Sequence, residues 1–120
     1  MPKILLVEDD AQLARNLVRF LSAEQFQVIH AAGQQDGLAA FQQGGFDCAL
    51  LDISLQDGNG FSICSAIKSQ SDTPVIFLTA SADESMTVAG FDVGADDYIS
   101  KPFQVEEVVE KMERLLTAKA

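Results

Sequence analysis

One aspartate in the sequence lies where a reactive carboxylate would be expected. The apolar run Cys48–Leu51 is typical of a strand buried on both faces of a sheet, and Asp52 follows it directly. The turn-forming segment Asp57–Gly60 comes soon after, so Asp52 lies close to the end of its strand. A carboxylate buried there is costly unless it is paired, binds a metal or reacts. Asp52 is therefore a candidate reactive group, and a simple cap of the following turn is the alternative.

Three further acidic residues follow the first predicted strand, Lys3–Val7. If this strand lies beside the one that precedes Asp52, then Glu8 and Asp9 meet Asp52 at one edge of the sheet. Three carboxylates so close together repel, and one would take up a proton unless a cation is present. Oxygen ligands beside a loop suit a hard divalent cation, Mg²⁺ or Mn²⁺. The third acid, Asp10, is more simply explained as the cap of the next helix.

A hydroxyl group and an ammonium group come at the ends of two more predicted strands. Thr79 ends the strand Val75–Leu78, and Lys101 follows the strand Asp97–Ser100. Beside a group of acids, a hydroxyl and an ammonium suit the oxygens of a phosphoryl group on Asp52. Each residue alone is ordinary, because threonine favours strands and lysine is usually a surface charge. Together with the acids they predict phosphoryl chemistry at this edge.

Strand-like and helix-like patterns alternate along the whole chain and would position these groups. Five such units with short connections predict an α/β fold, a doubly wound five-stranded parallel sheet with five helices, of the flavodoxin-like kind. The expected strand order is 2-1-3-4-5, which places the first and third strands side by side. The predicted strands are Lys3–Val7, Phe26–His30, Cys48–Leu51, Val75–Leu78 and Asp97–Ser100, and the predicted helices are Ala11–Glu24, Gln34–Gln43, Asn59–Ser69, Asp83–Val93 and Val105–Thr117.

Length and composition limit the class of protein. The 120 residues are enough for one domain with one core. A net charge of -10 argues against binding of nucleic acid or an anionic membrane. No apolar run approaches the roughly 20 residues of a membrane span, and no signal peptide is recognisable, so we expect a cytoplasmic protein. Cys48 and Cys64 lack metal-ligand spacing and are expected to be buried, reduced thiols.

Five segments of the chain together resemble the CheY-like receiver domain of two-component response regulators. The resemblance covers essentially residues 1–120 and implies a signalling switch rather than an enzyme, with at most self-phosphorylation from a phosphodonor and autodephosphorylation. Gln56 is a departure, because the family commonly has proline there, and glutamine makes the loop after Asp52 less rigid. The five segments are Val7–Asp10, Leu51–Leu55, Asp57–Gly60, Leu78–Ala80 and Gly94–Phe103.

The resemblance implies a role for each of the acids expected at this edge. Asp52 would accept a phosphoryl group from a sensor histidine kinase in a reaction that requires Mg²⁺. Asp9 would ligate the metal directly, and Glu8 would do so through a water molecule. The backbone carbonyl of Ser54 would complete the protein's share of the ligands.

The same resemblance implies how the signal leaves the site. Lys101 would contact the phosphoryl oxygens, Thr79 would move toward them, and Tyr98 would then repack inward. The fourth helix, the fifth strand and the fifth helix form the surface that we expect to be remodelled.

The segment Gly94–Phe103 looks most like receivers of the OmpR/PhoB type. Those receivers form homodimers through the remodelled surface and carry a DNA-binding domain after the receiver. The resemblance therefore implies control of transcription through a C-terminal domain absent from this chain, of which residues 1–120 would be the N-terminal part. Thr87 stands where that type usually has a basic residue. The residues that fit the dimer interface are Asp96, Asp97, Glu107 and Lys111.

Several other functions are open at this point. The chain could be a single-domain receiver that acts by docking to another protein. A phosphatase of the haloacid dehalogenase type also uses an aspartate and Mg²⁺, but in an Asp-x-Asp pattern after the first strand, whereas Asp52 follows the third and is succeeded by Ser54. A nucleotide- or flavin-binding module would need a longer glycine loop than Asp57–Gly60. A receiver without phosphorylation chemistry conflicts with the intact set of site residues.

Overall fold

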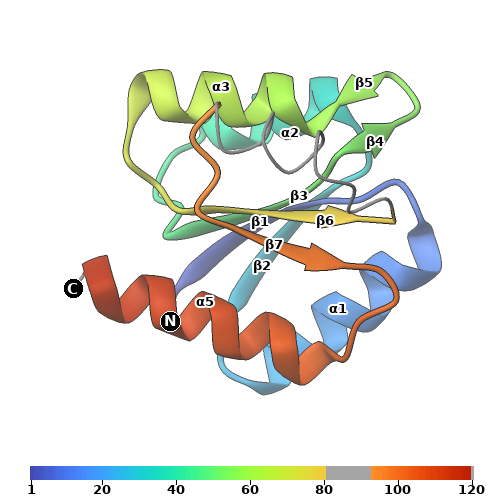
Figure 1. Cartoon of the computed structure of the whole chain (residues 1–120), viewed down its shortest axis with the longest axis vertical. Helices are drawn as coiled ribbons and strands as arrows, with labels where there is room; N and C mark the ends of the chain where they lie inside the picture. The colour runs from blue at the N-terminus through green and yellow to red at the C-terminus, as the bar shows by residue number, and fades with distance from the viewer. Residues whose placement is uncertain (81–92, 120) are drawn as a thin grey trace.

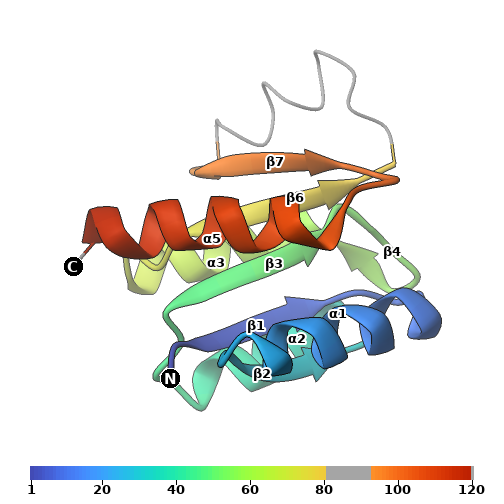
Figure 2. The same ribbon diagram turned by 90° about the horizontal axis from the view of Figure 1, so that it is seen from below.

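A five-stranded parallel sheet forms the centre of the chain in a computed structural model, which describes residues 1–80 and 93–119 (Figure 1). The strand order is β2-β1-β3-β6-β7, which confirms the predicted order 2-1-3-4-5 and is seen from below in Figure 2. The strands are β1 (Lys3–Val7), β2 (Gln27–Ala31), β3 (Cys48–Asp52), β6 (Val75–Thr79) and β7 (Asp97–Ser100).

Four helices of the described residues cover the two faces of the sheet. Figure 1 shows α2 and α3 on one face and α1 and α5 on the other. The predicted fourth helix, over 83–93, lies outside the described part except for its last residue, Val93, which is in a turn. The last helix extends two residues beyond its predicted end at Thr117. The helices are α1 (Ala11–Ala23), α2 (Gln34–Gln42), α3 (Gly60–Gln70) and α5 (Val105–Lys119).

The central strands are buried on both faces, as their uninterrupted apolar runs predict. In β3, Ala49 and Leu51 pack toward α2 and α3, whereas Cys48 and Leu50 pack toward α1 and α5. Cys48 is fully buried, and both cysteines of the chain are free thiols, as expected. No helix in the described part of the chain is long and apolar enough to cross a bilayer.

The segment between β3 and α3 differs from its prediction as a simple turn. Two short strands, β4 (Ser54–Leu55) and β5 (Gly58–Asn59), pair as a small antiparallel hairpin, which we call the β4–β5 hairpin. Asn59 then caps α3, because its side-chain oxygen accepts a hydrogen bond of 2.9 Å from the Ser62 amide. The hairpin therefore connects the end of β3 to the start of α3 and determines how the chain leaves Asp52.

Gly60 allows the backbone of α3 to approach the end of β3 closely. Its amide donates a hydrogen bond of 2.9 Å to the Ile53 carbonyl. A Cβ atom at this position would overlap the backbone carbonyl oxygen of Asp52 and would lie 3.2 Å from the Phe77 ring. Because these are main-chain and core atoms, no flexible group can move aside to make room.

We expect Gly60→Ala to lower the free energy of unfolding by about 1–3 kcal/mol, the usual cost of overpacking. Urea denaturation followed by circular dichroism measures this change. Ser65→Ala, at an exposed position of the same helix, is the matched control and should cost nothing. Equal stability of the two variants would refute the close approach.

Candidate functional site

The three predicted metal ligands meet at the carboxyl edge of the sheet. Strands β1 and β3 pair in parallel with Val7 opposite Leu51, so the residues that follow them are neighbours. One carboxylate oxygen from each of Glu8, Asp9 and Asp52 lies within 4.8 Å of the others. We call these three residues the acid cluster. Its oxygen donors are the type that a hard divalent cation prefers.

Burial distinguishes the members of the acid cluster. Glu8 is 0% exposed and Asp52 is 6% exposed, whereas Asp9 is half-buried. Water therefore cannot screen the first two carboxylates as it screens a surface pair. Their charges need compensation from a neighbouring cation.

Lys101 provides this compensation within the protein. Its ammonium nitrogen lies 2.7 Å from Glu8 Oε1 and 3.2 Å from Asp52 Oδ2. The backbone of β7 brings it there, because the Lys101 amide donates a hydrogen bond of 2.7 Å to the Thr79 carbonyl at the end of β6. The sequence predicted Lys101 at this edge but not its contact with Glu8.

The environment shifts the pKa of two groups in the site. Burial, followed by the hydrogen-bonding and charge of Asp52, raises the pKa of Glu8 to about 7, although Lys101 and the Asp10 amide oppose this change. Burial would lower the pKa of Lys101, but Glu8 and then Asp52 outweigh it, so this pKa is raised and the ammonium form persists. Burial thus makes the charged form of Glu8 costly to maintain without a further cation.

The remaining predicted site residues are Thr79, Ser54 and Tyr98. Thr79 is buried at the end of β6, opposite Ser100 of β7. The amide of Ser54 donates a hydrogen bond of 3.3 Å to Asp52 Oδ1, which holds the Ser54 backbone against this carboxylate. Tyr98 is half-buried on β7, and its ring centre lies 5.6 Å from that of Phe77.

The capping prediction for Asp10 is confirmed. Its Oδ1 accepts hydrogen bonds of 3.1 Å from the amides of Gln12 and Leu13 at the start of α1. Asp10 therefore has a structural explanation that does not involve a metal.

Sequence reasoning assigned Asp57 to a turn and missed its contacts. The Asp57 carboxylate accepts hydrogen bonds from the backbone amides of Gln34 and Gln35, at distances of 2.7 and 3.1 Å. These amide donors lower its pKa. One sequence signal was available, because Gly33 precedes the predicted helix and has no side chain to cap it.

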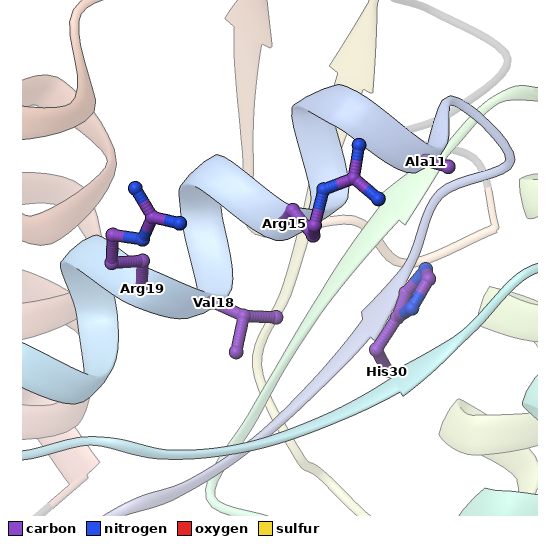
Figure 3. Close-up of a pocket in the computed structure, with 5 residues that line it drawn as sticks. All are labelled: Ala11, Arg15, Val18, Arg19 and His30. Atoms are coloured by element: carbon purple, nitrogen blue, oxygen red, sulfur yellow. The ribbon is translucent and has the colours of Figure 1, made fainter.

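Two surface hollows lie near the ends of β1 and β2 and the start of α1. One, of about 400 Å³, is lined by residues that include Lys101, Asp10 and Ala80, so it gives access to the site from solvent. The other, of about 550 Å³, lies between α1 and β2 (Figure 3). Arg15 and Arg19 border the second hollow, and none of the predicted site residues lines it.

Comparison with known proteins agrees with this architecture. The chain matches the family model of the response regulator receiver domain over residues 4–113. The response regulator ArlR of Staphylococcus aureus is 42% identical over 116 residues, which are 97% of this chain and 53% of ArlR. The chain thus spans about half the length of the curated relatives it matches.

Solved structures are similar over nearly the whole chain. The non-phosphorylated HemR receiver domain from Leptospira biflexa has a TM-score of 0.89 and 36% identity, with 97% of this chain and 94% of that chain covered. The response regulator TrrA from Thermotoga maritima, in complex with Mg²⁺-BeF, has a TM-score of 0.86 and 28% identity, with 96% and 99% covered. The family match and these structural likenesses lead to one conclusion: the chain belongs to the receiver domains of two-component response regulators.

Proposed function

We propose that Asp52 is the phosphoacceptor of this receiver domain and takes its phosphoryl group from a sensor histidine kinase. One observation carries the proposal: the Lys101 ammonium contacts Asp52 and Glu8 together, with an Asp9 oxygen in the same cluster. An acceptor carboxylate, metal ligands and a cation for the phosphoryl oxygens are thus present within one small site.

The reaction is a transfer between two nucleophiles. A carboxylate oxygen of Asp52 forms a bond to phosphorus while the bond from phosphorus to the kinase histidine nitrogen breaks, and that nitrogen keeps the electron pair. Lys101 can then donate to the phosphoryl oxygens, because its ammonium already lies 3.2 Å from Asp52 Oδ2. Phosphoryl transfer from a small phosphodonor and hydrolysis of the acyl phosphate would use the same groups.

The acid cluster fits Mg²⁺, or Mn²⁺ in its place. Asp9 and Asp52 would bind the metal directly, Glu8 through water, and the Ser54 carbonyl as the remaining protein ligand. When bound, the cation neutralises charge on the phosphoryl oxygens. The support is the oxygen-only donor set within 4.8 Å and the raised pKa of Glu8, which comes first from burial and then from the hydrogen bond and charge of Asp52.

Thr79 and Tyr98 are the proposed switch residues. Thr79 is buried at the end of β6, and its carbonyl is bonded to the Lys101 amide. A new hydrogen bond from the Thr79 hydroxyl to a phosphoryl group would therefore act on the β6–β7 edge that carries Tyr98. The surface predicted to carry the signal outward combines β7, α5 and the expected fourth helix, which lies outside the described residues apart from Val93.

The proposed output is control of transcription through a C-terminal DNA-binding domain in a cytoplasmic regulator. The support is the span of the chain, which covers about half the length of ArlR. A single-domain receiver that acts by protein docking is the alternative.

A homodimer through the same surface is a further part of the proposal. Asp96 pairs with Lys68 at 2.8 Å, and Asp97 pairs with Lys111 at 3.2 Å, both within one chain. In a dimer these carboxylates could also accept from basic groups of the second copy, because each has several acceptor sites.

We predict one phosphoryl adduct on incubation with acetyl phosphate and Mg²⁺, measured by intact mass spectrometry. Asp52→Asn should abolish the adduct because the amide is a poor nucleophile. Asp10→Asn is the matched control, since asparagine also caps a helix, and should keep the adduct. An adduct of equal yield in the Asp52 variant would contradict the assignment.

Glu8 predicts a pH-dependent response to Mg²⁺. Its pKa is about 7 in the folded protein against an ordinary value of 4.5, so the folded state holds the proton more tightly. Its stabilising contribution is complete below pH 4.5 and is lost as the pH rises through 7. Metal ligands must be deprotonated, so Mg²⁺ should raise the melting temperature more at pH 8 than at pH 5.5.

Differential scanning fluorimetry measures both effects, with Glu8→Gln as the comparison. Without metal, the wild type should lose stability relative to Glu8→Gln between pH 5 and pH 8. A parallel pH dependence of the two proteins would show that Glu8 is not the titrating group.

A further inference from the structure

Two side chains attach the β4–β5 hairpin to the start of α2. One belongs to the hairpin and bonds the α2 backbone, and the other belongs to α2 and bonds the hairpin backbone. The Asp57 carboxylate accepts hydrogen bonds from the Gln34 and Gln35 amides, at 2.7 and 3.1 Å. In return, the Gln34 side-chain oxygen accepts a hydrogen bond of 2.8 Å from the Asn59 amide. We call these three hydrogen bonds the α2 clamp. It joins two segments that lie more than twenty residues apart in the sequence.

Asp57 takes the place of a local helix cap. The first amides of a helix have no partner within the helix, and a side chain at the N-cap usually satisfies them. Here the N-cap is Gly33, which makes no side-chain hydrogen bond. A Cβ atom on Gly33 would lie 2.6 Å from Asp57 Oδ1, so the carboxylate fills the space of that missing side chain. A negative charge at this end of a helix is also electrostatically favourable.

The hairpin needs such external support. It contains only two residue pairs, Ser54 with Asn59 and Leu55 with Gly58, too few for an independently stable hairpin. Gln56 at its tip does not restrict the backbone as a proline would. Three features hold the hairpin in place: the buried side chain of Leu55, the turn into α3 and the α2 clamp.

The clamp leads directly to the acid cluster. Asn59, held by Gln34, pairs across the hairpin with Ser54. The Ser54 amide in turn contacts Asp52 Oδ1 at 3.3 Å. Any displacement of the hairpin from α2 would therefore move the Ser54 backbone relative to Asp52.

We propose that Asp57 is a positioning residue for the reaction at Asp52. Through the α2 clamp it keeps the Ser54 backbone beside Asp52 and so sets the affinity of the site for a divalent cation. This inference rests on the proposed function for the metal, and the clamp itself is independent of it.

The test separates positioning from simple helix capping. Asp57→Ala should weaken Mg²⁺ binding, measured by NMR titration, by about three- to tenfold, at or below the usual range for groups that orient metal ligands. It should also speed amide exchange at Gln34 and Gln35. In the double variant Gly33→Ser, Asp57→Ala, the serine has room to cap α2. A serine N-cap bonds the second or third amide of a helix, so exchange at Gln35 should slow again while Gln34 stays fast and Mg²⁺ binding stays weak.

Recovery of wild-type Mg²⁺ affinity in the double variant would overturn the inference, because Asp57 would then be only a cap. Unchanged affinity in Asp57→Ala would overturn it as well. Asp36→Asn is the matched control: it removes a carboxylate from the first turn of the same helix and should leave the affinity unchanged.

Gln34→Ala provides a second route if the Asp57 variants unfold. It removes the acceptor for the Asn59 amide but leaves Asp57 free to cap α2. We expect about twofold weaker Mg²⁺ binding, as for the loss of one neutral hydrogen bond, with α2 still protected. Wild-type affinity in this variant would count against the clamp.

Failure of the proposed function can be distinguished from failure of the clamp. A wild-type protein that binds no Mg²⁺ would refute the proposed metal site and with it the positioning role. The clamp would then be tested by measuring hydrogen exchange of the Asn59 amide in the absence of metal. Faster exchange there in both Asp57 variants would support the clamp, and exchange equal to the wild type would refute it.

Discussion

Lys101 donates to two carboxylates that the sheet would otherwise bury together without compensation. Glu8 and Asp52 lie at the ends of two adjacent parallel strands, so the fold itself brings their charges together. The strand β7 then carries a cation to the same edge, 2.7 Å from one acid and 3.2 Å from the other. The strand order β2-β1-β3-β6-β7 matters for function because it decides which strand ends are neighbours.

This balance of charge is incomplete, and that gives the site its responsiveness. Three carboxylates lie close together, the Lys101 ammonium contacts two of them, and burial raises the pKa of Glu8 to about 7. A divalent cation or a phosphoryl group changes the local charge by about two units. The buried carboxylates respond to this change more strongly than exposed ones would, because water screens them less. In a chain of net charge -10, an acid cluster of this kind attracts cations, in keeping with the metal-dependent phosphoryl transfer proposed for it.

The sequence predicted the sheet order and the acid cluster because both depend on local patterns. Apolar runs alternate with helical periods, and parallel strands place Glu8, Asp9 and Asp52 at one edge. The β4–β5 hairpin was missed because two-residue strands have no readable periodicity. The contact between Lys101 and Glu8, 93 residues apart in the sequence, depends on side-chain direction, which spacing alone does not give. The role of Asp57 was hidden for the same reason.

The acid cluster and Lys101 are proposed to form one Mg²⁺-dependent phosphoryl site centred on Asp52. A crystal structure with Mg²⁺ and beryllofluoride tests this most directly. We predict the beryllium on Asp52, the metal against Asp9 and the Ser54 carbonyl, and Lys101 on a fluorine atom. Beryllofluoride on a different residue, or a metal bound away from the acid cluster, would contradict this assignment.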